Sequence, residues 1–305
     1  MPPNAIDVIK TIGASRIAPY RSHFQCKTDE ETLGAYFWGQ AVSSAFQACL
    51  GMYEVTLRNA IHAAASKFAN NATWYDYAQT WALPVHGPTK DKITDELYSG
   101  TPPLRRAPQP TPDVVVSSLS FGFWNGFLNG LTSREQPRIL TDTFAFHPHS
   151  KPKHWSITSN VSDLMGKLQK IQRLRNAVAH LEPIWKKHRL KGTETHWSHC
   201  VVSLRELHDD MMEIISWCCP HAASAVKNSY ARRLFLSICS TNAVKAFKAD
   251  PFAAGRMTPF ADLLPRSSYA MPPTYAWIAP QGNAYWSAMR PVLTYWPPLT
   301  ASTLP

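Results

Sequence analysis

Apolar residues recur at three- and four-residue steps along most of the chain, and strand-like alternation is scarce. The longest such stretch runs from Thr28 to about Ala69 and predicts one long helix, with Gly51 as the candidate point for a bend. Thr28 and Glu31 have the spacing of a capping box, in which a hydroxyl and a carboxylate satisfy exposed amides at a helix start. The pattern predicts an all-α fold.

Further helices are expected on both sides of a proline-rich loop at residues 101–112, which carries Arg105 and Arg106. Thr111, Pro112 and Asp113 supply a cap, a first-turn proline and an acid at the positive helix end. The remaining predicted helices are a short one near Thr89–Leu97, a largely apolar one from Val114 to about Leu128, one from about Ser156 to His180, and two or three within Ser198–Lys248.

The C-terminal segment differs in composition from the rest. Residues 251–305 contain ten prolines and nine aromatic residues, among them Trp277, Trp286 and Trp296. Prolines at this density interrupt helices and ladders. We therefore expect a helical domain over residues 1–248 and a proline- and aromatic-rich tail over 249–305. The tail could stack on unpaired bases or dock on its own domain or a partner.

Lysine and arginine number 31 against 21 acidic residues, which gives a formal charge of +10. This excess favours a polyanionic partner, either nucleic acid or an anionic membrane surface. No run approaches the roughly 20 apolar residues that span a bilayer, and the N-terminus lacks the pattern of a secretory signal. The six cysteines form no CxxC pair and suit a reducing compartment. We expect a cytoplasmic protein without a membrane partner.

One helix end concentrates groups that could act on a phosphodiester. Glu182 precedes Pro183, so the helix should end near His180, where the dipole favours the protonated imidazolium. Asn176 shares a face with His180, and Arg175 is adjacent. Histidine exchanges protons, arginine makes bidentate phosphate contacts, and asparagine can hold a ribose hydroxyl or orient the histidine.

The surroundings of this helix end are basic. Between Leu164 and Lys191 the only acid is Glu182. Such a field suits binding to a nucleic-acid backbone, whereas an ordinary helix end with capping cations and a solvated basic loop is the alternative. The lysines and arginines of this stretch are Lys167, Lys170, Arg173, Arg175, Lys186, Lys187, Arg189 and Lys191.

The run Arg175-Asn176-x-x-x-His180, followed by Leu181-Glu182-Pro183-Ile184-Trp185, resembles the Arg-Asn-Arg-x-Ala-His-His-Glu-Pro-Ile motif of Abi-like (abortive infection, AbiD/AbiF type) proteins of the HEPN superfamily. The segment Glu54-Val55-Thr56-Leu57-Arg58-Asn59-Ala60-Ile61 resembles a second family motif, and Leu119-Ser120-Phe121-Gly122-Phe123-Trp124 a third. The likeness covers roughly Thr28 to Ala223. Ala177 stands where the family commonly has arginine, and Leu181 where it has a second histidine, which bears on phosphate binding and substrate choice.

The resemblance implies an HEPN-like helical bundle that forms a homodimer and cleaves RNA without a metal or other cofactor. His180 would act as general base or acid, Arg175 would stabilise the phosphorane, and the products would carry a 2′,3′-cyclic phosphate and a 5′-hydroxyl. Phage defence or toxin-like growth arrest would be its role. The rivals are a non-catalytic HEPN protein that binds RNA or a partner, and a toxin held by a protein or RNA antitoxin.

The candidate site residues fall into three groups. Glu54 and Arg58 could support the site, or form a surface pair with each other. A zinc site among His196, His199, Cys200 and the histidines and cysteines downstream lacks the usual ligand spacing. The groups are catalytic (Arg175, Asn176, His180), supporting (Glu54, Arg58, Asn59, Glu182) and RNA-binding (Arg173, Lys186, Lys187, Arg189), with no metal ligand.

Overall fold

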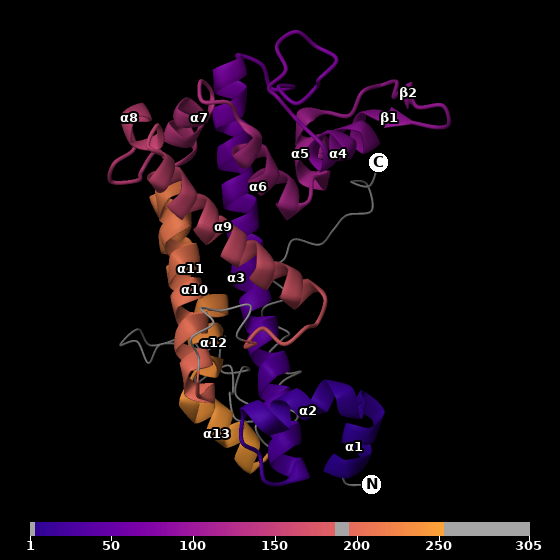
Figure 1. Cartoon of the computed structure of the whole chain (residues 1–305), viewed down its shortest axis with the longest axis vertical. Helices are drawn as coiled ribbons and strands as arrows, with labels where there is room; N and C mark the ends of the chain where they lie inside the picture. Colours follow the sequence, from indigo (N-terminus) through magenta and orange to yellow (C-terminus); the bar gives the residue numbers. More distant parts are fainter. Residues whose placement is uncertain (1–3, 187–194, 253–305) are drawn as a thin grey trace, which may run out of the picture. The chain divides into compact units, whose positions relative to one another are not determined.

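The computed structural model describes residues 4–186 and 195–252, and within them the fold is all-α (Figure 1). Strand is limited to one two-residue pair, in which Tyr98 faces Arg105 and Ser99 faces Leu104. The elements are α1 (Ala5–Ile12), α2 (Ala14–His23), α3 (Asp29–Ala69), α4 (Pro88–Leu97), β1 (Tyr98–Ser99), β2 (Leu104–Arg105), α5 (Pro112–Ser118), α6 (Phe121–Gly130), α7 (Gln136–Thr143), α8 (Pro152–Trp155), α9 (Thr158–Ala179), α10 (Trp197–Cys218), α11 (Pro220–Lys227), α12 (Tyr230–Ile238) and α13 (Thr241–Ala249).

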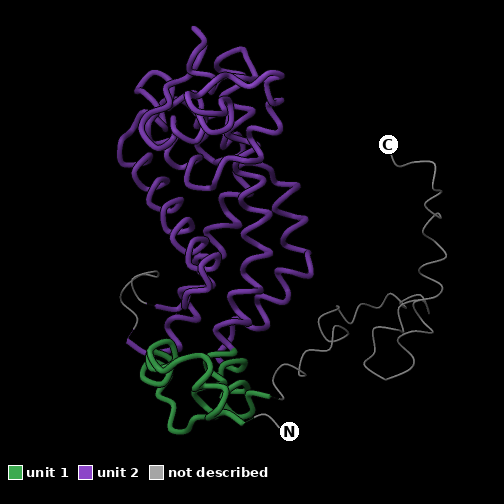
Figure 2. Tube along the Cα trace, turned by 90° about the vertical axis from the view of Figure 1, so that its right-hand side faces the viewer, with its two compact units in different colours: residues 1–37, 242–305 green, residues 38–241 purple. Residues whose placement is uncertain are grey.

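The chain divides into two compact units, coloured separately in Figure 2. Unit 1 combines Met1–Phe37 with Asn242–Pro305, and unit 2 is the continuous segment Trp38–Thr241. Unit 1 is thus built from two segments that are far apart in sequence. All the candidate site residues belong to unit 2.

Unit 1 depends on a close approach between the start of α3 and the end of α13. A Cβ atom on Gly34 would lie 1.9 Å from the Phe247 carbonyl oxygen, so only glycine fits there. Lys248 reinforces the contact by donating to the Phe24 carbonyl oxygen at 2.9 Å, 3.7 Å from Glu31. The backbones of the two segments therefore touch directly.

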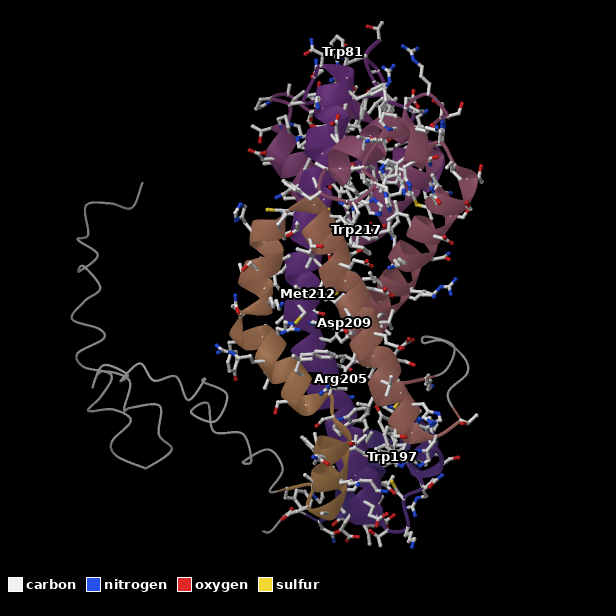
Figure 3. The ribbon with its side chains drawn as sticks, turned by 90° about the vertical axis from the view of Figure 1, so that its left-hand side faces the viewer. Trp81, Trp197, Arg205, Asp209, Met212 and Trp217 are labelled. Atoms are coloured by element: carbon white, nitrogen blue, oxygen red, sulfur yellow. The ribbon has the colours of Figure 1, made fainter. Side chains whose placement is uncertain are left out.

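Unit 2 is organised around α3, along which α10 lies (Figures 1 and 3). His208 of α10 is fully buried between Phe46 of α3 and Phe235 of α12, with its ring stacked 4.7 Å from Phe235. About one turn before His208 on α10, Arg205 donates to the Leu236 and Cys239 carbonyl oxygens, both at 2.7 Å. A guanidinium at these terminal carbonyls satisfies groups that a helix end leaves without partners.

Three predicted helices are confirmed. α3 begins as expected: the Glu31 amide donates to the Thr28 hydroxyl at 3.2 Å, while the Glu31 carboxylate accepts from the Lys27 amide. The short helix before the hairpin is α4, and α9 ends at Ala179 with His180 as its C-cap. None of the helices in the described ranges combines the length and apolar character that a bilayer crossing requires.

The single helix predicted from Val114 to Leu128 is wrong, because α5 ends at Ser118 and α6 begins at Phe121. Ser117 and Ser118 turn their hydroxyls back to the Val114 and Val115 carbonyl oxygens, which competes with helix continuation. Leu119 is extended and buried between the two helices. Thr111 is the N-cap residue of α5 but makes no side-chain capping bond.

The region after residue 197 contains more helices than predicted. Four helices, α10 to α13, replace the two or three expected, because Cys219, Ser229 and the Cys239–Ser240 segment interrupt the pattern. Cys219 and Ser229 each cap the helix that follows through a side-chain acceptor. The expected loop at 101–112 also supplies β2, and Arg105 pairs there with the buried Asp76.

Candidate functional site

The C-terminal end of α9 is fixed by a Schellman motif. The Leu181 amide donates to the Val178 carbonyl oxygen at 3.1 Å, and the Glu182 amide to that of Ala177 at 2.8 Å. Leu181 takes the left-handed position with φ of +54°, which usually belongs to glycine or asparagine. The chain then turns inward, where Ile184 and Trp185 are buried. These contacts set where the last turn of α9 ends.

Arg175 is held from the side of α3. Its Nε lies 3.3 Å from Oε2 of Glu54, and the two side chains keep 34% and 22% of their exposure. Arginine carries five N–H donors, so among the residues that the structure describes the pair with Glu54 leaves the two terminal nitrogens for another ligand. α9 passes obliquely across α3 in Figure 1, and this ion pair joins the two helices. Glu54 therefore pairs with Arg175 and not with Arg58 on the surface of α3.

Arg58, one turn along α3, faces a second segment. Its Nη1 donates to the Ser117 carbonyl oxygen at 3.5 Å, at the end of α5, and its Nε is buried without a hydrogen bond in the described part of the chain. His62 lies farther along and accepts from Trp74 Nε1 at 3.0 Å. Burial lowers the pKa of His62, although Asp113 opposes this. Glu54 and Arg58 thus join α3, the α5–α6 junction and α9, whereas His62 belongs to the aromatic packing.

His180 and Asn176 lie on the solvent side of α9. Both are exposed, and the imidazole of His180 makes no hydrogen bond to any residue that the structure describes. At about 100° per residue, His180 points about 140° away from Arg175 around the helix axis. Within one chain, the imidazole and the guanidinium therefore do not face each other, so their closeness in sequence does not place them in one pocket.

The other predicted residues are more scattered. Asn59 is exposed on α3, about 140° around the axis from Glu54, and does not join Arg175. Arg173 is exposed on α9, Glu182 is exposed in the following turn, and Lys186 is half-buried. Lys187 and Arg189 lie outside the described residues. Among the other cations of the basic stretch, Lys167 pairs with Asp210 and Glu213 of α10.

The two departures from the family motif have structural counterparts. Ala177 is fully buried, so an arginine there would carry its guanidinium into the core. Leu181 is 63% exposed and occupies the left-handed position, which histidine tolerates better than leucine.

A groove between α6 and α9 lies next to this site and was not predicted. It has a volume of about 540 Å³ and is lined by the side-chain amides of Asn125, Asn129, Gln169 and Gln172. Glycines at positions 122, 126 and 166 keep it open. The amides recur at three- and four-residue steps on both helices, a signal that the sequence carried. The sequence alone does not show that α6 packs against α9, so the spacing of the amides did not predict a groove.

Histidines also gather before α9. The rings of His147, His149 and His154 have centroids 5.0 to 5.9 Å apart. The Nδ1 atom of His147 accepts from the His149 amide, and burial together with the two neighbouring histidines lowers the pKa of His147. Across the described ranges, no group of three histidine, cysteine, aspartate or glutamate side chains is placed to hold a metal ion.

No protein-family model matches the chain, and neither a curated protein nor a solved structure is significantly similar to it.

Proposed function

We propose that this protein is an Abi-like endoribonuclease of the HEPN type, which cleaves RNA without a metal ion and acts in phage defence or growth arrest in the cytoplasm. The observation that carries the proposal is the ion pair between Arg175 and Glu54. It unites two segments, 121 positions apart in sequence, that independently resemble motifs of that family. The Ser117 contact of Arg58 adds the junction before the third motif.

The chemistry follows from the groups at this site. The 2′-oxygen of a ribose attacks the adjacent phosphorus, and the bond from phosphorus to the 5′-oxygen breaks. The free nitrogens of Arg175 stabilise the phosphorane, while one imidazole removes the 2′-proton and another protonates the 5′-oxygen. The products are a 2′,3′-cyclic phosphate and a 5′-hydroxyl.

Two imidazoles and a guanidinium require a second copy of the chain. Because His180 is exposed and turned away from its own Arg175, a homodimer would complete the site by presenting His180 of one protomer to Arg175 of the other. Met52 and Val55 of α3 are 45% and 41% exposed, and an interface between copies would cover them. Light scattering should give twice the chain mass, and M52E combined with V55E should give the monomer mass without cleavage.

A second function has one specific observation in its favour. Glu54 partly neutralises Arg175, and His180 lies on another side of the helix, an arrangement that holds RNA or a protein partner without cutting it. On this alternative, which includes a toxin bound by an antitoxin, the motif is a binding surface.

RNA cleavage in EDTA separates the two functions. The nuclease is supported by cyclic-phosphate ends that form in EDTA and disappear in both His180→Ala and Arg175→Ala. Lys92→Ala, which removes one exposed positive charge on α4 as Arg175→Ala removes one on α9, should cleave normally and serves as the matched control. RNA binding by all variants with no cleavage by any of them would exclude the nuclease and leave the binding protein.

A further inference from the structure

The lining of the groove between α6 and α9 ends at Gln172, about one turn of α9 before Arg175 and Asn176. Gln169, Gln172 and Asn176 follow at steps of three and four residues, so they line one side of the helix. Gln172 and Arg175 are likewise one turn apart. Gln172 lies roughly 6 Å along the axis from Asn176. A strand bound at Asn176 and His180 would therefore enter this groove next.

The groove is lined by uncharged residues, although α9 also carries exposed cations. Helix α6 contains no charged residue. Lys170 and Arg173, both exposed on α9, lie outside the lining. The exposed cations of α9 suit phosphates, while the groove offers amide donors and acceptors. Amides of this kind suit the edges of bases, which carry a donor beside an acceptor.

The central amide pair is held in one orientation. Asn125 Nδ2 donates both to Gln172 Oε1 at 2.7 Å and to the Leu168 carbonyl oxygen at 3.3 Å. Because the Leu168 carbonyl only accepts, the amide of Asn125 cannot be turned around. Asn125 Oδ1 is consequently buried without a hydrogen-bond partner among the described residues. Gln172 directs its Nε2 toward Gly122, where a Cβ would be 3.0 Å away.

A buried acceptor without a donor costs about 1–3 kcal/mol, and a ligand with an N–H group would recover it. Asn125 Oδ1 is an acceptor and Gln172 Nε2 a donor, and both belong to hydrogen-bonded neighbours that line the groove. We propose that this groove binds one unpaired base of the RNA that the Arg175–His180 site acts on, and that Asn125 and Gln172 read the edge of that base. The inference rests on the proposed function, since it names a specificity subsite of the same site.

A groove-filling variant tests the proposal without disturbing the fold. A side chain at Gly166 meets no atom within 4 Å of its Cβ, so Gly166→Leu should fold and project into the groove. Gly130→Leu is the matched control, because its Cβ also meets open space but it does not line the groove. With oligoribonucleotides in which each base is varied in turn, Gly166→Leu should lower binding at least about tenfold. Gly130→Leu should match the wild type.

Gln172→Met removes the polar edge but keeps the volume of the side chain. It should abolish the base preference at one position and leave the salt dependence of binding unchanged, since no phosphate contact is lost. Arg173→Gln should do the reverse and weaken binding equally for all sequences. Gln47→Met, an exposed change on α3, controls for the substitution itself.

The outcomes separate this inference from the nuclease proposal. Binding measured in the His180→Ala background tests the groove even if no cleavage occurs, so a base preference lost in Gly166→Leu supports the groove alone. Cleavage by the wild type with an identical base preference in Gly166→Leu and Gly130→Leu overturns the groove alone. A change from dimer to monomer in Gly166→Leu would show a protein interface there and overturn it too. If the wild type binds no RNA, both proposals fall.

Discussion

The ion pair between Glu54 and Arg175 can be measured with a double-mutant cycle of Glu54→Gln and Arg175→Gln. Charges 3.3 Å apart attract by about 5 kcal/mol at an effective dielectric constant of about 20, before desolvation is subtracted. Exposed pairs contribute about 0.2–1 kcal/mol after that subtraction. Because both side chains are only partly exposed, we expect a coupling free energy of about 1 kcal/mol.

Urea unfolding of the four proteins gives this coupling as the departure from additivity of the two single changes. The coupling should fall in about 1 M salt, where the screening length of about 3 Å matches the separation of the charges. Lys92 and Asp95 of α4 form a matched control, since they lie 3.7 Å apart and are 57% and 67% exposed. A coupling for Glu54 and Arg175 no larger than that of the control would refute the structural role of the pair.

Three further outcomes are expected. Leu181→Gly should be about 1 kcal/mol more stable to urea than Leu181→Ala, since both lose the side chain and only glycine relieves the left-handed backbone; equal midpoints would contradict this. Ala177→Arg should cost on the order of 3 kcal/mol or more by thermal unfolding, whereas Arg at the exposed Ala179 should be neutral. Burial lowers the pKa of His208 below its ordinary 6.5, with smaller opposing and reinforcing effects from neighbouring charges, so the folded state binds fewer protons than the unfolded state. The contribution of neutral His208 to the free energy of unfolding should therefore be complete above about pH 6.5. It should fall as the pH drops toward the lowered pKa, by up to about 1.4 kcal/mol per pH unit. His208→Leu should flatten this dependence, and an unchanged slope in urea unfolding at about pH 5 and 7 would exclude His208 as its source.

Much of the helical fold could be predicted because local rules decide it. The capping box at Thr28 and the proline after Glu182 act within a few residues, and the structure places the ends of α3 and α9 accordingly. The break at Leu119 was missed for a different reason. The apolar periodicity continues through this break and so does not indicate it. The break arises because serine hydroxyls compete for backbone carbonyl oxygens and because Leu119 is buried between the two helices.

The candidate site was predictable only in part. Sequence order suggested that Glu54 supports Arg175, and the structure brings these two together. The sequence motif did not show in which directions the side chains point around α9. His180 belongs to the same motif as Arg175 but is rotated away from it about the helix axis. The amides of the groove gained meaning only when α6 and α9 were seen to pack through Asn125 and Gln172.

Gly34 has a consequence for how the chain folds during its synthesis. The segment that packs against it begins at Asn242, after the 204 residues of Trp38–Thr241. At about 5–20 residues per second, the helices before Phe37 leave the ribosome roughly 10–40 s ahead of that segment. Unit 2, being continuous, can fold in this interval, while Gly34 and the Phe24 carbonyl oxygen wait for Phe247 and Lys248 to be synthesised.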